Sequence, residues 1–455
     1  MIVPNSVTNI DKYAFSCCRG LRSLTLPFIG SQRGNTGTEE SVFGHLFGVS
    51  AYEGLTNVVQ AYSYESNAIT VKRYIPSSLK RITITDETVI AKGAFDNCRC
   101  VKNIIVNDGI CHVGEYAFAH CRNLIGMVIP DSVTNIEQCI FADCGSLERL
   151  TLPFVGSRRG NDKTAECAVG WIFGELLPVS SLDVDEFIHI RQWVNGANFW
   201  CYIPKSLKSV VVTDETTVAT ASFDNCHNLE NIVIGDSVTN IQERAFAACQ
   251  GLQNLILPFV GAKRDAPSGT WESMFGYIFG VKPGEGLVQV RQSLGVSGVS
   301  GWTTNYISAA LTDVTITDER PLDYGSFYGC SMLTNVLLNS NIETIGGYAF
   351  RNCTGLRQID LPSELHTLDV AAFRGSGLET VFVPLSVTNM AGWVFESCKS
   401  LRLAYVPRRF KGNLGYNTFA NCADDLQIIY YDENMKFFNE TLATEDGSST
   451  NIVAV

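Results

Sequence analysis

Few residues of this 455-residue chain are placed to do acid–base, nucleophilic or metal chemistry. Its six histidines are scattered, and no H-E-x-x-H, P-loop, G-x-S-x-G or paired C-x-x-C motif occurs. The nearest approaches to a metal or redox motif are Cys17-Cys18, the C-R-C sequence at Cys98, and the acidic run 183–186, which lacks further ligands at calcium-loop spacing. We therefore predict no catalytic residue, no metal site and no cofactor.

A 23-residue pattern organises the chain around these scattered residues. Its cleanest copy is 124–146, which reads L-x-x-[IVL]-x-[IVL]-P-x-x-V-x-x-I-x-x-x-A-F-x-x-C-x-x. A fixed period of this length predicts a solenoid, because one unit cannot bury its apolar face alone and stacks on its neighbours. We predict that the phenylalanines of the A-F-x-x-C turn stack on one another as an aromatic spine. The phenylalanine slot recurs at Phe95, Phe118, Phe141, Phe223, Phe246, Phe327, Phe350 and Phe373.

Ten of the sixteen cysteines share one slot, three residues after the phenylalanine, and Ser376 fills that slot in another copy. We predict an inward column of small buried side chains. Neighbouring rungs of a sheet are about 4.8 Å apart, whereas a disulfide needs Cβ atoms about 3.8 Å apart. The number of cysteines therefore does not indicate an oxidising compartment. The ten are Cys18, Cys98, Cys121, Cys144, Cys226, Cys249, Cys330, Cys353, Cys398 and Cys422.

The L-x-x-[IVL]-x-[IVL] segments predict the strands of a parallel β-sheet with about fourteen rungs. Alternating apolar positions suit short strands with one face inward, and repetition in one direction makes the sheet parallel. The S-V-T-N-I runs at 6–10, 132–136 and 237–241 should form the opposite wall. The segments begin at Leu21, Leu79, Val101, Leu124, Leu147, Leu207, Leu229, Leu252, Leu311, Leu333, Leu356, Leu378, Leu401 and Leu426.

Three repeats are much longer than the others and carry inserts at about 28–76, 154–204 and 259–308. Each leaves its strand through L-P-F-[IV]-G and then has a Gly-flanked aromatic pair, whose last members, Phe47, Phe173 and Phe279, should replace the spine phenylalanine. Alternating segments then indicate an outgoing strand, and Asn195-Gly196 supplies a tight-turn signal in the second copy. Each insert is therefore predicted to be a β-hairpin; the outgoing strands are 57–64, 187–194 and 287–294.

The repeats extend over almost the whole chain. We predict one continuous solenoid over 1–431 and a C-terminal cap or tail over 432–455, with Phe437 and Phe438 covering the last rung. The sequence opens partway through a repeat, so we expect an N-terminally truncated solenoid whose signal is not present in this chain.

No apolar run reaches a membrane-spanning length. The net charge of −12, without a Lys or Arg cluster, disfavours nucleic acid.

The combination L-x-x-I-x-I-P, V-x-x-I and A-F-x-x-C resembles the BspA-like leucine-rich repeat family of bacterial and protist surface proteins, and the match covers nearly every rung between Val3 and Tyr431. Proline replaces the Asn or Cys that commoner leucine-rich repeats place after the strand. The resemblance implies a leucine-rich-repeat solenoid, α/β or mainly β, and a role in adhesion or protein binding. It implies no catalytic residues.

Two surfaces are candidates for ligand binding. The outward strand position becomes aromatic near the C-terminus, at Phe382, Tyr405 and Tyr430 beside Arg402, residue types that dominate interface energetics. Strand propensity or coverage by the C-terminal tail would also explain this column. The other surface is the hairpins, whose aromatic residues could bind a partner or bury one another in a satellite core. These are Tyr62, Tyr64, Trp193, Phe199, Trp200, Trp302 and Tyr306.

The repeats, the missing catalytic groups and the varied inserts favour a non-catalytic binding or adhesion module at the cell surface, with a protein or glycan ligand. One alternative is a carbohydrate-binding or glycan-active domain, in which paired carboxylates face each other across a hairpin cleft. Another is an intracellular leucine-rich-repeat scaffold, which the reduced-looking cysteines permit. An extracellular or cell-surface location is expected, with no membrane span in this chain.

Overall fold

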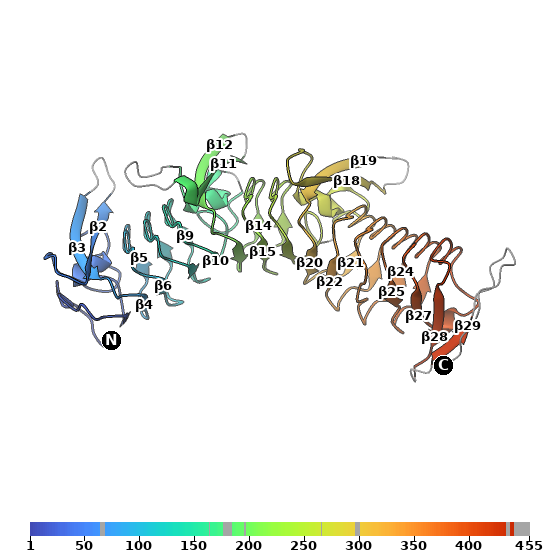
Figure 1. Ribbon diagram of the computed structural model, residues 1–455, viewed down its shortest axis with the longest axis horizontal. Helices are drawn as coiled ribbons and strands as arrows, with labels where there is room; N and C mark the ends of the chain where they lie inside the picture. Colours follow the sequence, from blue (N-terminus) through green and yellow to red (C-terminus); the bar gives the residue numbers. More distant parts are fainter. Residues whose placement is uncertain are drawn as a thin grey trace. The chain divides into compact units, whose positions relative to one another are not determined.

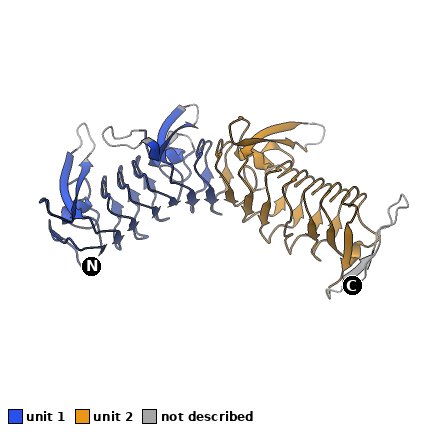
Figure 2. Cartoon of the chain, in the orientation of Figure 1, with its two compact units in different colours: residues 1–238 blue, residues 239–455 orange. Residues whose placement is uncertain are grey.

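The computed structural model describes residues 1–63, 69–162, 164–175, 184–194, 197–264, 266–295, 301–433 and 437–440. The chain forms two compact units, Met1–Val238 and Thr239–Val455 (Figure 2). Each unit is a parallel β-solenoid, and the chain has about fourteen turns of roughly 23 residues. The predicted fold class is thereby confirmed. A single continuous solenoid over 1–431 with a C-terminal cap or tail stays a prediction.

The main sheet of unit 1 is a ladder of short parallel strands (Figure 1). Side chains alternate between core and outside, so that Leu24 and Leu26 are buried while Thr25 is half-exposed. The register passes across the long inserts without a slip: Leu150 pairs with Val210, 60 residues later. The strands are β1 (Ser23–Leu26), β4 (Arg81–Ile84), β6 (Asn103–Ile105), β8 (Gly126–Val128), β10 (Arg149–Leu152), β13 (Ser209–Val212) and β15 (Asn231–Ile234).

Unit 2 repeats this ladder with one interruption. The rung beginning at Leu356 keeps Leu356 and Ile359 buried but forms no strand, contrary to the prediction. Its outward position is Asp360, and aspartate has low strand propensity. The strands are β17 (Asn254–Leu257), β20 (Asp313–Ile316) and β22 (Asn335–Leu338) before the interruption, and β25 (Thr380–Phe382), β27 (Leu403–Pro407) and β28 (Gln427–Tyr431) after it, with β29 (Phe437–Glu440) antiparallel to β28.

Two-residue strands form the opposite wall of each solenoid. Two of the three predicted S-V-T-N-I runs contribute strands, β9 (Asn135–Ile136) and β16 (Asn240–Ile241), whereas 6–10 forms none. The N-terminal run has no preceding rung in this chain to pair with. The other wall strands are β5 (Val89–Ile90), β7 (His112–Val113) and β14 (Thr217–Val218) in unit 1, and β21 (Pro321–Leu322), β23 (Thr344–Ile345), β24 (Thr367–Leu368) and β26 (Asn389–Met390) in unit 2.

The A-F-x-x-C turn reverses the chain through two left-handed residues that flank the phenylalanine. Around Phe118, for example, Tyr116 and His120 both have φ of 55°. The phenylalanines between these positions stack directly: Phe95 on Phe118 at 5.6 Å, and Phe350 on Phe373 at 5.1 Å between ring centroids. The predicted aromatic spine is therefore the core of the turn side.

The cysteine column is buried as predicted, and its thiols have a specific partner. Cys121 Sγ donates to the carbonyl of Phe95 and Cys144 Sγ to that of Phe118, each at 3.2 Å. Each thiol thus bonds the backbone of the preceding rung. All sixteen cysteines lie within the described residues, and none of them forms a disulfide. Within the column, only the end members, Cys18 and Cys422, are half-exposed.

Each long repeat contains an antiparallel strand pair that rises from the turn side of its solenoid (Figure 1). The first hairpin is β2 (Leu55–Ser63) with β3 (Ile69–Pro76), the second is β11 (Phe187–Val194) with β12 (Ala197–Pro204), and the third is β18 (Leu287–Ser293) with β19 (Trp302–Ser308). The Gly-flanked aromatic pairs form one-turn 3-10 helices, η1 (Phe43–Leu46), η3 (Val169–Ile172) and η6 (Phe275–Ile278). Phe47, Phe173 and Phe279 then contact the spine at Phe15, Phe141 and Phe246.

Candidate binding surfaces

Each hairpin is fastened to the solenoid by one fully buried glutamine on its first strand: Gln60, Gln192 or Gln292. In the second hairpin, Gln192 Oε1 accepts from the Gly170 amide at 2.9 Å, while its Nε2 donates to the carbonyls of Ser222 and Asp224 at 3.3 and 3.1 Å. Gln60 and Gln292 make the corresponding bonds to Gly44 and Gly276. One side chain thus links hairpin, 3-10 helix and the next turn.

A buried glutamate fastens the loop that leaves each strand through L-P-F-[IV]-G. Glu215, for example, accepts from the amides of Val155 and Gly160 at 3.2 and 2.7 Å, and Glu87 and Glu319 take the same place in the other inserts. Burial raises the pKa of Glu215, and it raises that of Glu319 to about 7, although amide donors favour the charged form. These carboxylates hold the insert in place.

An ion pair accompanies each of these glutamates. The residue before the glutamate is an aspartate that pairs with an arginine of the same insert: Arg33 with Asp86, Arg159 with Asp214, and Arg264 with Asp318. Our reading of the sequence missed both the glutamate and the aspartate. The signal was present, because the triplet T-D-E recurs at Thr85, Thr213 and Thr317, directly after the strand that follows each insert.

The second hairpin presents the predicted residues Trp193 and Trp200 on its outward face, 41% and 44% exposed. Phe199 lies on the other face, opposite Gln192 in the register, and is half-buried. The structure therefore places the two tryptophans together and separates Phe199 from them.

The outward face of the second hairpin forms a continuous column, which we name the aromatic ridge: His189, Arg191, Trp193, Trp200 and Tyr202. The His189 ring stacks on Tyr202 at 4.3 Å and on Trp200 at 4.7 Å. The Arg191 guanidinium lies 5.9 Å from the Trp200 ring centroid and 5.6 Å from that of Trp193. Rings and cation thus alternate across the two strands.

The third hairpin has a related but shorter arrangement. Trp302, 47% exposed, lies 4.6 Å from the Arg291 guanidinium and 5.7 Å from the buried ring of Tyr328. Arg351 then lies over Tyr328 and Tyr348 on the following turns. The rings of this hairpin therefore continue onto the solenoid.

The first hairpin carries neither a tryptophan nor an arginine on its outward face. Its exposed residues there include Val59 and Lys72, with Tyr74 half-buried. Tyr62 is half-buried, and Tyr64 lies outside the described residues. Aligned on the buried glutamine, Tyr74 corresponds to Tyr202 and Tyr306, so one outward tyrosine is shared while the neighbouring positions differ.

The C-terminal column differs from the prediction at its last residue. Phe382 is 41% exposed and pairs with the half-buried Tyr405, 5.8 Å away. Tyr405, however, pairs with Ile429 in the next strand, which turns Tyr430 inward and leaves it 4% exposed. Placing Tyr430 on the outward column was therefore wrong by one residue of register, which moves a side chain to the other face.

Beside this column the next tyrosine, Tyr431, occupies a structural position. Its ring lies 4.8 Å from that of Phe382, and its hydroxyl donates to the Val383 carbonyl at 2.6 Å. Arg402, the fourth predicted residue, is exposed and forms an ion pair with Asp425. Phe382 and Tyr405 remain as the outward aromatic pair.

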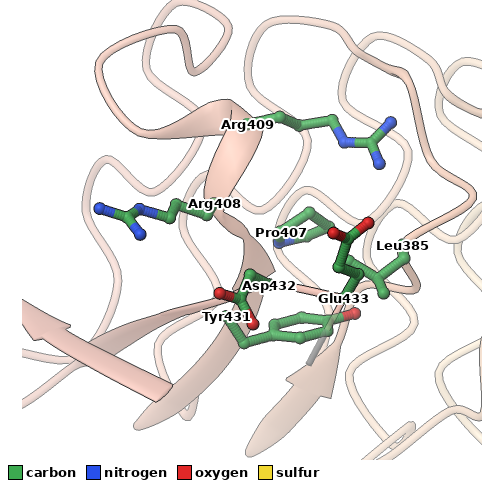
Figure 3. Close-up of a pocket in the computed structure, with 7 residues that line it drawn as sticks. All are labelled: Leu385, Pro407, Arg408, Arg409, Tyr431, Asp432 and Glu433. Atoms are coloured by element: carbon green, nitrogen blue, oxygen red, sulfur yellow. The ribbon is translucent and has the colours of Figure 1, made fainter. Parts of the chain in front are cut away.

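A pocket of about 350 Å³ opens next to Tyr431 (Figure 3). Leu385, Pro407 and Tyr431 supply its apolar wall, and Arg408 and Arg409 extend from its rim in different directions. Asp432 and Glu433 complete the lining, so that both signs of charge surround it. The pocket is small and charge-balanced.

The described residues contain no cluster of three or more His, Cys, Asp or Glu side chains that could hold a metal ion. Burial raises the pKa of the Cys98 and Cys100 thiols, which does not favour the thiolate that redox or metal chemistry needs. Part of the acidic run 183–186, Asp183, lies outside the described residues. Within the described part of the chain, no helix is both long and apolar enough to cross a membrane.

Comparison with known proteins gives one family and several structural likenesses. A leucine-rich repeat protein from Bacteroides ovatus is 20% identical, covering 94% of this chain and 91% of that one, with a TM-score of 0.32. A leucine-rich cell surface protein from Faecalibacterium prausnitzii is 16% identical, covering 84% and 94%, with a TM-score of 0.26. The pneumococcal vaccine antigen PcpA is 17% identical, covering 85% and 88%, with a TM-score of 0.25. No curated protein matches the chain.

The family model describes the solenoid itself. The BspA type leucine-rich repeat region matches in six copies, over residues 1–38, 67–161, 198–262 and 321–444. These segments cover well over half of the chain and include rungs on both sides of every insert. The chain therefore belongs to the BspA type leucine-rich repeat family.

Proposed function

We propose that this chain is a non-catalytic binding module of the adhesion type, which acts at a cell surface and contacts a protein or glycan ligand through the outward faces of its hairpins. The family that matches the chain is a repeat-protein family, which supports a binding role. Nucleic acid is not a proposed partner, because the net charge is −12. A membrane core is not proposed either, because no apolar run of the sequence reaches a membrane-spanning length.

The observation that carries the proposal is a contrast within each hairpin. The inward face repeats the same glutamine in all three copies, with the same type of bond to a glycine amide. The outward face shares one tyrosine and otherwise changes, from Val59 in the first copy to Arg191 and Arg291 in the others. A fixed attachment that carries a varied exposed face is the arrangement expected of a recognition element on a rigid scaffold.

A capture experiment tests the proposal. The immobilised chain is exposed to matrix proteins and to a glycan array, and compared with a variant in which Trp193, Trp200 and Trp302 are replaced by serine. These side chains are exposed, so the variant should keep the parent's melting temperature but lose most of its capture. A second variant, Phe382→Ser with Tyr405→Ser, should capture as the parent does.

Two results would contradict the hairpin assignment. Full capture by the triple-tryptophan variant would remove the hairpins from the binding surface. Loss of capture only in the Phe382 and Tyr405 variant would move the binding surface to the C-terminal column.

A further inference from the structure

The two central rings of the aromatic ridge, His189 and Trp200, each contact two neighbouring members of the column, which leaves mainly their edges exposed. The His189 ring lies between Trp200 and Tyr202, and Arg191 lies between Trp200 and Trp193. The edge of an aromatic ring carries partial positive charge. The indole N–H groups of both tryptophans have no acceptor among the described residues. The ridge therefore presents a surface that favours electron-rich atoms.

The ridge also carries a cation, Arg191, for which the described residues supply no carboxylate partner. Within the part of the chain that the structure describes, Arg191 has no carboxylate within ion-pair distance, and its one side-chain hydrogen bond goes from Nε to the Asn198 amide oxygen. Arg159, in the same insert, is paired with Asp214. In a chain with 46 acidic and 34 basic residues, an arginine held by two indoles and an amide is oriented for an external anion.

The backbone edges of the second hairpin are closed along the ridge. On β11, the Trp193 amide donates to Asp224 Oδ2 at 3.4 Å, and the Arg191 carbonyl accepts from Asn225 Nδ2 at 2.6 Å. On β12, the Trp200 amide donates to Glu175 Oε1 at 3.4 Å, and the Tyr202 amide donates to the Gly174 carbonyl at 3.2 Å. A peptide therefore cannot add here as an extra strand, which is the mode that gives extended peptides their main-chain hydrogen bonds. Recognition on this face must use side chains.

From these observations we propose that the aromatic ridge binds a carboxylate-bearing sugar. Arg191 binds the sugar carboxylate through its outer N–H groups, and the indole N–H groups of Trp193 and Trp200 donate to hydroxyl or ring oxygens. The apolar C–H surface of the sugar rests on the exposed ring edges. This proposal adds a ligand class to the proposed binding function of the hairpins. It rests on that function only for where the binding takes place.

A glycan fits these groups better than an acidic peptide does. A peptide would contribute its carboxylates on flexible side chains and would leave its backbone amides without partners on a face that offers donors and no acceptor strand edge. A sugar acid presents one rigid carboxylate beside several oxygen acceptors. Sialic acids and uronic acids share this chemistry, and the experiment separates them.

Binding of defined probes to the full chain, measured by isothermal titration calorimetry, tests the proposal. The probes are 3′-sialyllactose with lactose as its neutral control, trigalacturonic acid with galactotriose as its neutral control, and a hexaglutamate peptide. We expect one of the two acidic sugars to bind at least about tenfold more tightly than its neutral control, as a charge-assisted bidentate contact predicts. Binding should weaken as salt is added.

Arg191→Ala should reduce that binding by about tenfold or more, and Arg191→Lys should restore only part of it, because an ammonium keeps the charge but loses the planar fork. The matched control is Arg149→Ala, which removes one exposed arginine from β10 in the same unit. Melting temperatures of all three variants check that the fold is intact.

Several outcomes would overturn the proposal: no binding of either acidic sugar, equal binding of the neutral controls, tighter binding of hexaglutamate, or unchanged binding by Arg191→Ala. Each of these leaves the capture experiment with the triple-tryptophan variant unaffected. Loss of acidic-sugar binding alone therefore rejects the ligand class, whereas full capture by the triple-tryptophan variant rejects the hairpin surface itself.

Discussion

At the scale of single residues, the cysteine column shows how a chemically reactive residue type can be used for structure alone. Cys353 and Cys398 each donate a thiol hydrogen bond to the phenylalanine carbonyl of the preceding rung, at 3.1 Å. Burial raises the pKa of both thiols. In the slot filled by Ser376, the hydroxyl lies 3.3 Å from the Cys398 sulfur. Each position of the column therefore requires a small side chain that can donate a hydrogen bond. Cysteine meets this requirement with a less polar group than serine does.

Gly30 is the position of the first L-P-F-[IV]-G segment at which only glycine fits. It has a φ of 75°, and an added Cβ would lie 1.8 Å from the Glu40 carbonyl oxygen. Gly37, in the same insert, has a similar φ of 71° but nothing within 4 Å of an added Cβ. We expect Gly37→Ala to cost only about 1 kcal/mol, for the left-handed conformation, and Gly30→Ala to cost several times more because backbone must move.

Urea unfolding followed by circular dichroism gives the comparison between the two glycine variants. Equal shifts of the unfolding midpoint for Gly30→Ala and Gly37→Ala would show that the close approach to Glu40 is not required.

Glu319 should make stability depend on pH. Burial raises its pKa from 4.5 to about 7 in the folded chain, so the native state keeps a proton that the unfolded state releases. The stabilisation from this proton is therefore complete below pH 4.5 and is lost as the pH rises to about 7. Glu319→Gln can still accept from the Val260 amide without ionising. Relative to the parent, it should gain stability across this window, by at most about 3 kcal/mol.

The measurement is the difference in melting temperature between Glu319→Gln and the parent at pH values from 4 to 8. Glu364→Gln, at an exposed position of the same unit, controls for the removal of one carboxylate. A difference that stays constant over the range would contradict the assignment of the pH dependence to Glu319.

At the scale of elements, each hairpin is held rigid where it meets the solenoid and is free to vary beyond it. The glutamine bonds, the buried glutamate and the arginine–aspartate pair all lie at the base of the insert. Fixing the base limits the conformations that a ligand has to select, which lowers the entropic cost of binding. The outward residues can then change without disturbing the attachment.

Gln292 and Gln289 lie on the same strand of the third hairpin. Comparing them distinguishes a residue that attaches the hairpin from one on its exposed face. Gln292 is fully buried and bonds Gly276, Ser326 and Asn305, whereas Gln289 is exposed. Gln292→Ala leaves the Gly276 amide without a partner and removes one of the two hydrogen bonds to the Ser326 carbonyl, which still accepts from the Phe275 amide. We expect this loss to destabilise unit 2 by about 2–4 kcal/mol. Gln289→Ala should change stability by less than about 0.5 kcal/mol.

Hydrogen exchange of the peptides covering β18 and β19 reads out the attachment directly. We expect faster exchange in Gln292→Ala and parental exchange in Gln289→Ala. Parental exchange in both variants would mean that the hairpin is held by other contacts.

At the scale of the whole molecule, the repeat pattern predicted the parts of the fold that identical residues mark. Phe118 and Cys121 recur at a fixed spacing, and the structure stacks or buries their counterparts in order. The hairpin strands followed from simple alternation, and the observed β11 has the predicted bounds. The structure at the recurrent positions could be predicted from the sequence because each repeat packs against neighbours of the same kind.

The remaining features depend on contacts that the pattern does not encode. The segment after Leu426 has apolar residues in both alternations, with Ile428 and Tyr430 in one and Ile429 and Tyr431 in the other, so sequence alone could not choose the register. The attachment of the inserts was missed because Gln60 and its counterparts are polar and read as solvent-facing. Their burial depends on a glycine amide more than ten residues away. The aromatic ridge required knowledge of which hairpin face turns outward.

The C-terminal edge of unit 2 shows how the ladder ends, and it supports a last prediction. β29 pairs with β28 in the antiparallel direction, so a further parallel rung cannot add at this edge. Deleting residues 433–455 would expose the amides and carbonyls of β28, which is an unprotected strand edge. We expect this variant to self-associate as its concentration rises, in light scattering after size exclusion, whereas deletion of 441–455 keeps β29 and should keep the parent's mass. A truncated chain that is folded and retains the parent's mass at every concentration would show that β29 does not protect the edge.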